Sequence, residues 1–311
     1  MNKRYLLLFL LLASCYRVPD TLEPKMSYCV QEQRFKCLDS AFTPLSPIER
    51  GEDWGREMII GKAFAAQLDL YRAISTFKRA VILTPKDNER RLESQYDILL
   101  CYFLSNKYCD TVNEFEQSEL ANVDKTFPAY HDLLLVLYES YRELCVPEKE
   151  QRIYELIQAN FPETAERLRV SIALREGDID EIECIANTLE QPNYLDPVLD
   201  NYYAKKKSVA AAQTLNTIPG LGYLYIGQKR SAVTAFILNG LFIAAAVEFF
   251  RRGNLPAGII TSSFEAGWYF GGIYGAGEEA KYYNERIYEQ EATRTLNDNC
   301  LFPALMLRHS F

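Results

Sequence analysis

Histidine is scarce in this chain of 311 residues, which contains only His131 and His309. The two lie far apart in sequence, so the chain offers little material for a histidine acid–base pair, a Ser-His-Asp triad or a multi-histidine zinc site. Its eight cysteines include no Cys-x-x-Cys spacing, which argues against a thioredoxin-like motif and a metal site. We therefore expect no enzyme, no catalytic residue, no cofactor and no metal.

Clustered positive charge is also nearly absent. The net charge is −8, and the only basic run covers residues 205–207. Because phosphate binding needs clustered Lys and Arg, we expect no nucleic-acid partner. With 48% apolar and 24% charged residues, the chain can instead bury a core and form about two domains.

The beginning of the chain has the pattern of a secretion signal. A basic stretch at residues 2–4 precedes an apolar run over residues 5–12. The run is too short to cross a bilayer, since a helical span needs about 20 residues. Residues 1–14 are therefore predicted to be a signal peptide.

Residues 12–15, with the sequence LASC, resemble the lipobox of bacterial lipoproteins. The resemblance implies that Cys15 is acylated and that the protein is lipid-anchored in the cell envelope on the periplasmic side. In Gram-negative lipoproteins an Asp after the cysteine commonly retains the protein in the inner membrane, so Tyr16 permits export to the outer membrane. The alternative is an ordinary secretory signal with an incidental cysteine.

Residues 15–51 contain several prolines without sustained periodicity and predict a tether. Over residues 52–204, apolar residues recur at spacings of three and four, which is typical of helices. Six of these residues stand at the relative positions of the 34-residue tetratricopeptide repeat: Gly61, Phe64, Ala73, Phe77, Ala80 and Pro85. Glu57 replaces the tryptophan of that family.

The repeat residues have local physical reasons. Gly61 and Ala73 are small where two antiparallel helices would cross closely, and Pro85 would end the second helix. Weaker copies follow down to about residue 199, so the resemblance implies a solenoid of stacked helix pairs that holds a partner. A non-repetitive helical bundle is the alternative.

Residues 205–290 are predicted to form a hydrophobic hairpin domain, followed by a C-terminal tail over residues 291–311. Two apolar runs, 231–250 and 257–277, each have about the 20 residues needed to cross a membrane. Three glycines at spacings of four would supply a groove for close helix contact: Gly267, Gly271 and Gly275. A soluble hairpin buried by the repeats or by other copies of the chain is the alternative.

The segment before the first run resembles the entry of small two-transmembrane domains. The residues that carry this likeness are Pro219, Gly220, Gly222 and Gly227. Residues 215–286 are similar to the C-terminal part of a group of bacterial tetratricopeptide lipoproteins or membrane proteins. That likeness is carried by Phe264, Glu265, Gly267, Trp268, Tyr269, Ile273, Tyr274, Lys281, Tyr282 and Asn284.

Three polar residues lie inside the runs, namely Asn239, Glu248 and Glu265. Because a charge at mid-membrane is costly, Glu265 must face a partner helix or a cavity, or be protonated. If the hairpin closes near Asn254, Asn239 and Glu265 come close enough for an interhelical hydrogen bond. We expect a buried polar clasp, with an ion or proton path as the alternative.

Together these patterns predict an all-α protein with tetratricopeptide-like helical repeats and a glycine-rich hydrophobic hairpin. We expect a membrane-anchored lipoprotein that acts as a non-enzymatic interaction scaffold in the cell envelope. Its expected partners are membrane lipid, through Cys15 and the hairpin, an envelope protein, and other copies of the chain. An oligomeric pore or transport component built from the hairpin is the alternative function.

Overall fold

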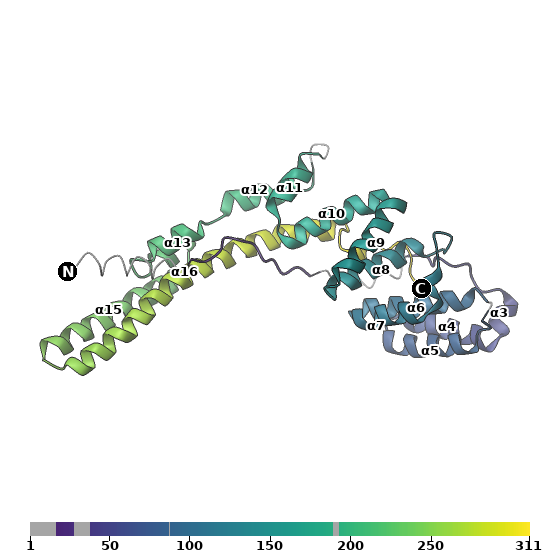
Figure 1. The fold of residues 1–311 in the computed structure, drawn as a ribbon, viewed down its shortest axis with the longest axis horizontal. Coiled ribbons are helices and arrows are strands. Elements are labelled where there is room, and N and C mark those ends of the chain that lie inside the picture. The colour runs from purple at the N-terminus through teal and green to yellow at the C-terminus, as the bar shows by residue number, and fades with distance from the viewer. Residues whose placement is uncertain (1–16, 28–37, 87, 189–192) are drawn as a thin grey trace. The chain divides into compact units, whose positions relative to one another are not determined.

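The computed structural model describes residues 17–27, 38–86, 88–188 and 193–311 (Figure 1). Within these residues every regular element is a helix, and extended pairing is limited to one isolated bridge between Ser40 and Ser310. The predicted all-α class is therefore confirmed. The helices form two compact units, which we call unit 1 (Met1–Met26 and Ala173–Thr295) and unit 2 (Ser27–Ile172 and Leu296–Phe311).

Unit 2 is built from short helices that pack in chain order. Its helices are α3 (Pro47–Gly51), α4 (Asp53–Ala65), α5 (Leu70–Leu83), α6 (Arg90–Leu104), α7 (Tyr108–Gln117), η2 (Glu119–Asn122), α8 (Tyr130–Glu143), α9 (Pro147–Asn160) and α17 (Pro303–Met306). From α4 to α9, each α-helix contacts the one that follows it. The unit is thus a series of neighbouring helix pairs.

The pair α4–α5 contains five of the six residues predicted to pack in the first repeat, and the sixth, Pro85, follows it. A Cβ atom added to Gly61 would lie 2.6 Å from Cε1 of Phe77, so the two helices meet closely at this glycine. Phe64 is partly buried against the same core, and Pro85 follows two positions after the last residue of α5. The fully buried residues of α5 are Ala73, Phe77 and Ala80.

The C-terminal end of the chain belongs to the core of unit 2. Residues 301–307 are almost completely buried, and α17 packs against α8. Phe311 stacks on Phe77 with ring centroids 6.4 Å apart. The predicted C-terminal tail, residues 291–311, thus contains the last part of α16 and a buried segment whose apolar residues cover a core far from them in sequence.

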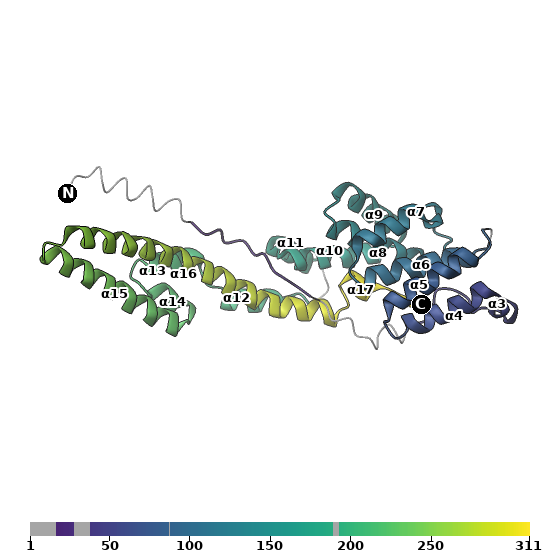
Figure 2. The same cartoon turned by 90° about the horizontal axis from the view of Figure 1, so that it is seen from below.

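Unit 1 contains the long helices. The last residues of α10 (Pro162–Glu176), from Ala173 onward, belong to unit 1. Its other elements are α11 (Ile179–Ala186), α12 (Asp196–Lys205), α13 (Val209–Leu215), α14 (Leu221–Ile226), α15 (Lys229–Arg251) and most of α16 (Leu255–Asp298). A short turn at residues 252–254 joins α15 to α16, and the two helices run side by side in opposite directions in both views (Figures 1 and 2).

The segment predicted to be a tether, residues 15–51, is mostly exposed where the structure describes it, but it packs against helices at two places. In unit 1, Val18 is buried in a core cluster with Ala280 of α16. In unit 2, Phe42 packs against Tyr96 with ring centroids 5.9 Å apart. Absence of helical periodicity did not mean absence of structure, since extended chain can also pack against helices.

Helix α15 presents an apolar surface to its surroundings. Phe236, Ile237 and Leu241 are all more than half exposed. Among the described residues, α15 is the one helix that is long and apolar enough to cross a membrane, and only 11% of its most apolar window is buried. The second run, residues 257–277, was expected to have the length of a membrane span, but α16 is not apolar enough to be one. The run contains Glu265 together with two serines and several glycines.

Candidate functional site

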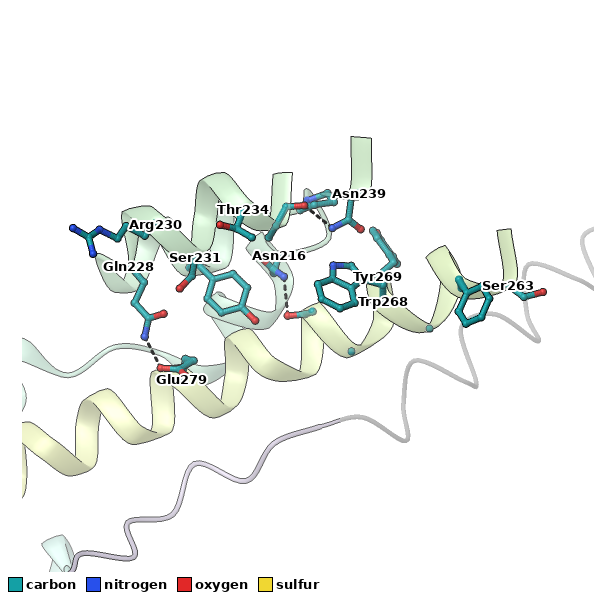
Figure 3. A pocket seen from close by; sticks show the side chains of 17 residues that line it. Asn216, Gln228, Arg230, Ser231, Thr234, Asn239, Ser263, Trp268, Tyr269 and Glu279 are labelled. Carbon is teal, nitrogen blue, oxygen red and sulfur yellow. Dashed lines mark hydrogen bonds between the residues drawn. The ribbon is translucent and has the colours of Figure 1, made fainter. Parts of the chain in front are cut away.

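A groove of about 880 Å³ lies in unit 1 between the turn that joins α13 to α14, helix α15 and helix α16 (Figure 3). The residues that line it include four of the predicted hairpin residues, namely Pro219, Asn239, Gly267 and Gly271. The groove therefore brings together residues from both runs and from the segment that precedes them.

The two ends of the groove differ in chemistry. Figure 3 shows Gln228, Arg230 and Glu279 at one end, with Asn239 and Ser263 toward the other. The side-chain amide of Gln228 donates a hydrogen bond to Oε2 of Glu279. Arg230 is exposed and has no hydrogen bond or ion pair to the described residues. One end of the groove is thus charged.

The walls beyond this charged end are mostly apolar, although they also include the polar side chains of Ser231, Thr234, Asn239 and Ser263. Ala235 of α15 and Phe264, Gly267, Trp268 and Gly271 of α16 line this part. Trp268 is about half exposed, and Phe264 is more so. The groove combines a charged mouth with an apolar channel, an arrangement suited to an amphiphilic ligand.

The turn beside the groove is organised by Asn216, which is buried. Its Oδ1 accepts hydrogen bonds from the backbone N–H groups of Gly220, at 3.0 Å, and Gly222, at 3.2 Å. Its Nδ2 donates to the carbonyl of Gly272 on α16 at 2.7 Å. Gly220 has a φ of +93°, and a Cβ atom there would lie 2.4 Å from the carbonyl oxygen of Ala232, so the position requires glycine.

The sequence reasoning missed Asn216. The available signal was an amide side chain shortly before a Pro-Gly turn, where Asn commonly bonds to nearby backbone groups. The other predicted glycines of this segment also have structural places. A Cβ atom on Gly222 would lie 2.4 Å from the carbonyl oxygen of Ala212, and Gly227 is the C-cap of α14.

Asn239 and Glu265 do not form the expected hydrogen bond. Nδ2 of Asn239 donates instead to the carbonyl of Ala235 on its own helix at 2.6 Å, and its Oδ1 is buried without a partner among the described residues. Glu265 lines a different cavity with Ala246 and Phe250, and both of its carboxyl oxygens are buried without a described partner. Counting residues from the turn predicts the depth of a side chain but not its direction around the helix.

The predicted glycine contact stripe is also not at a close helix crossing within this chain. A Cβ atom on Gly267 or Gly271 would meet no heavy atom within 4 Å. At Gly275 it would meet only the hydroxyl of Tyr223, at 2.8 Å. Close approach of α15 and α16 occurs instead at Gly258, where an added Cβ atom would lie 2.7 Å from the ring of Phe250. Gly267 and Gly271 border the groove.

Glu265→Leu is expected to stabilise unit 1. The substitution removes a buried carboxyl group that no described residue pairs, and it places an apolar side chain against Ala246 and Phe250. Replacing unpaired buried polar groups by apolar ones of similar size contributes about 1–3 kcal/mol. Thermal unfolding of the full chain in detergent would measure this, with Glu248→Leu as the control because Glu248 already pairs with Arg252 at 2.7 Å. A lower melting temperature for Glu265→Leu would contradict the expectation.

Both histidines are within hydrogen-bond distance of the same carboxylate, that of Asp132 in unit 2. Their separation in sequence had not predicted that they would lie close together. Nδ1 of His131 is 2.7 Å from Oδ1 of Asp132, and Nδ1 of His309 is 3.1 Å from Oδ2. Nε2 of His131 is 3.0 Å from the hydroxyl of Thr164. The backbone N–H groups of Arg308 and His309 also donate to the carboxylate, at 3.1 and 2.9 Å.

This cluster has a structural role, because its hydrogen bonds join two distant segments of unit 2. Asp132 is fully buried, and its oxygens accept hydrogen bonds from the backbone of the C-terminal segment. His131 is buried as well, and both of its ring nitrogens have a neighbour. The cluster therefore attaches the end of the chain to the start of α8. No sequence pattern pointed to Asp132.

A second cluster of buried polar side chains lies on α6, where residues 93–97 are almost entirely buried. Nζ of Lys62 is 2.6 Å from Oε1 of Glu93, and Nη1 of Arg90 is 2.6 Å from its Oε2. Both carboxyl oxygens of Asp97 are buried without a hydrogen-bond partner among the described residues. Burial raises the pKa of Asp97 to about 7, although the positive charge of Lys62 opposes the rise.

The raised pKa of Asp97 predicts that unit 2 loses stability as pH rises. The folded state holds the proton more tightly than the unfolded state, whose pKa lies near 3.8, so the free energy of unfolding decreases with pH between 3.8 and about 7. The slope from this group reaches at most about 1.4 kcal/mol per pH unit. Asp97→Asn is expected to remove it.

Unfolding curves at several pH values, followed by Trp54 fluorescence in a Trp268→Phe background, would test the slope. Trp54 is buried in α4 and therefore reports on unit 2. The exposed Asp53 supplies the control variant Asp53→Asn, which should keep the pH dependence of the parent. An unchanged slope in Asp97→Asn would show that another group titrates.

The remaining expectations concern lipid and metal. Cys15, the predicted lipidation site, lies outside the described residues. Among the residues that the structure does describe, there is no group of three or more His, Cys, Asp or Glu side chains placed to hold a metal ion. No protein-family model, curated protein or solved structure matches this chain.

Proposed function

We propose that this protein is a membrane-anchored lipoprotein whose helical unit 2 acts as a non-enzymatic scaffold for a protein partner in the bacterial cell envelope. The observation that carries the proposal is the surface of α15, a helix of 23 residues with an apolar face that the described part of the chain leaves uncovered. Such a surface is stable in hydrocarbon and unstable in water. The membrane is therefore the proposed partner of α15.

In the proposed membrane-bound state, α15 and the first half of α16 form a hydrophobic hairpin. α15 supplies the spanning length, since 23 residues at about 1.5 Å each cover the ~30 Å of hydrocarbon. The apolar part of α16 accompanies it, with exposed Ile259, Ile260 and Phe264. The second half of α16 is richer in charged residues and continues outside the membrane.

The residues that follow Cys15 support a lipid at the same end of unit 1. Val18 packs with Ala280, and the backbone N–H of Lys25 donates to Glu289 at 2.6 Å, so the chain traced backward runs along α16 toward its apolar part. Cys15 precedes Val18 by three residues, which span at most about 11 Å. A diacyl group on Cys15 and the apolar part of α16 can thus enter one membrane.

The scaffold role of unit 2 rests on its neighbouring helix pairs, which support a tetratricopeptide-like solenoid. Such stacks bury each pair against its neighbours and leave faces free for binding. Tyr71 and Ile82, both on α5, are about 80% exposed and supply apolar contact area for a partner. The buried polar residues of α6 and α8 hold the stack together rather than face a substrate.

Membrane fractionation tests the anchoring part of the proposal. The full chain and Cys15→Ala would each be expressed in a Gram-negative host, and the membranes would be washed with alkaline carbonate. We expect both chains to stay in the membrane pellet, because α15 holds the protein without the lipid. Release of Cys15→Ala would show that the lipid is the only anchor.

Photocrosslinking tests the scaffold part. A photoreactive residue at Tyr71 or Ile82, introduced into the full chain in growing cells, is expected to give one discrete crosslinked species. The same residue at Asp53, an exposed site of different chemistry on α4, serves as the control. Identical crosslinking from all three positions would reject a specific partner surface on α5.

A further inference from the structure

We propose that the groove between α15 and α16 binds a phospholipid whose head group carries both a phosphate and a primary ammonium. The inference rests on the proposed membrane location of α15 and adds a specific lipid site to it. One acyl chain would lie along Ala235, Gly267 and Gly271, with the head group at Arg230 and Glu279.

The depth of the charged residues fits a lipid head group. Arg230 is the second residue of α15, and Glu279 lies two residues beyond the apolar run of α16, so both stand at the edge of the hydrocarbon layer. From Arg230 to Asn239 the groove follows α15 for about 14 Å, at 1.5 Å per residue. The charged mouth and apolar channel therefore match the two parts of a phospholipid.

Charge complementarity selects the head group. The mouth offers the guanidinium of Arg230, which has no described ionic partner, and arginine binds phosphate through paired N–H donors. The mouth also offers the carboxylate of Glu279, whose one hydrogen bond from a described side chain comes from the neutral amide of Gln228. A phosphate with a nearby primary ammonium satisfies both charges. An anionic lipid leaves Glu279 unmatched, and a quaternary ammonium cannot donate a hydrogen bond to it.

The open glycines give the acyl chain its place. A Cβ atom on Gly267 or Gly271 would meet nothing within 4 Å, so the channel beside them is free space in the described chain. Trp268 lies between these glycines in sequence and lines the same groove. Its indole ring therefore reports directly on what occupies the channel.

Quenching of Trp268 by lipids with brominated acyl chains tests the site. The full chain with Trp54→Phe would be reconstituted into phosphatidylcholine vesicles that contain a minor, equal fraction of brominated phosphatidylethanolamine, phosphatidylglycerol or phosphatidylcholine. We expect the ethanolamine lipid to be enriched beside Trp268 on the order of fivefold over the choline lipid, as for one exposed ion pair of about 1 kcal/mol.

Variants identify the mouth of the groove. Arg230→Gln should remove the enrichment, and Glu279→Gln should abolish the preference for ethanolamine over choline. Lys229→Gln is the matched control, because Lys229 carries the same charge one position earlier and does not line the groove. If Lys229→Gln and Arg230→Gln lose the same amount of lipid enrichment, general surface charge explains the enrichment and the proposed site is overturned.

A second pair of variants tests the channel. Gly271→Leu fills it and should remove the enrichment without changing any charge. Gly240→Leu is its control, since Gly240 is an exposed glycine of α15 with open space around it and lies outside the groove. Retained enrichment in Gly271→Leu would overturn the channel.

The outcomes separate this site from the membrane location itself. Equal quenching by all three brominated lipids would overturn the lipid site while leaving α15 and α16 in the bilayer. Stronger quenching by brominated phosphatidylglycerol than by brominated phosphatidylethanolamine would overturn the head-group assignment. Absence of quenching by any brominated lipid would overturn the membrane location and the site together.

Discussion

A chain that carries Ile237→Lys and Leu241→Lys in a Cys15→Ala background is expected to leave the membrane fraction. Both side chains lie near the middle of α15, one helical turn apart, and are 52% and 61% exposed. A lysine at the centre of a membrane helix costs ~2.5–3.5 kcal/mol, so the pair costs about 5–7 kcal/mol. That is enough to shift most of the protein into the soluble or aggregated fraction.

The control for this prediction uses equally exposed apolar residues of unit 2. Tyr71→Lys with Ile82→Lys adds the same charge to α5, and these side chains are exposed to water in the proposed account. Immunoblots of the carbonate pellet and supernatant would compare the two double variants. Loss of both from the pellet would mean that added charge alone, rather than its place on α15, causes release.

Asp132→Ala is expected to destabilise unit 2 by about 3–5 kcal/mol, the usual cost of removing one partner from a buried charged network. The change leaves the backbone N–H groups of Arg308 and His309 and the imidazoles of His131 and His309 without their shared acceptor. We expect the C-terminal segment to detach from α8 before the rest of the unit unfolds.

Two readouts distinguish detachment from a general loss of stability. Carboxypeptidase should remove the last residues of Asp132→Ala faster than those of the parent chain, at temperatures where Trp54 still reports a folded core. Asp53→Ala, which alters an exposed ion pair, should change the free energy of unfolding by less than about 1 kcal/mol. Equal carboxypeptidase rates in Asp132→Ala and the parent would mean that other contacts hold the segment.

The sequence was most informative where the relevant residues are close together in the chain. Ala73, Phe77 and Ala80 recur at helical spacing on α5, and Gly61 lies on the preceding helix. Local periodicity therefore located the helices and the face they bury. The position of Pro85 likewise follows from its inability to continue a helix.

The sequence was least informative where the contact joins distant parts of the chain. His309 and Asp132 are 177 positions apart, and no local pattern relates them. The buried C-terminal segment was missed for the same reason. A single sequence shows which residues can be buried, but it does not show which distant residue they will meet.

The groove shows a third kind of difference. The prediction placed Asn239, Glu265 and the glycines by their spacing along each helix, but spacing does not give the rotation of a helix about its axis. Because α15 and α16 meet at Gly258 and Phe250, the glycine face turns to the groove, and Glu265 turns to another cavity. Helix rotation depends on packing along the whole pair, which residue spacing alone does not determine.

Cysteine labelling in isolated membranes tests most directly whether α15 lies in hydrocarbon. Every cysteine except Cys15 would be replaced by alanine, and single cysteines would be introduced at Ile237 or at Tyr71. A water-soluble maleimide is expected to label Tyr71→Cys rapidly and to leave Ile237→Cys unlabelled, although both positions are exposed on the isolated chain. Labelling of Ile237→Cys as fast as Tyr71→Cys would contradict the account.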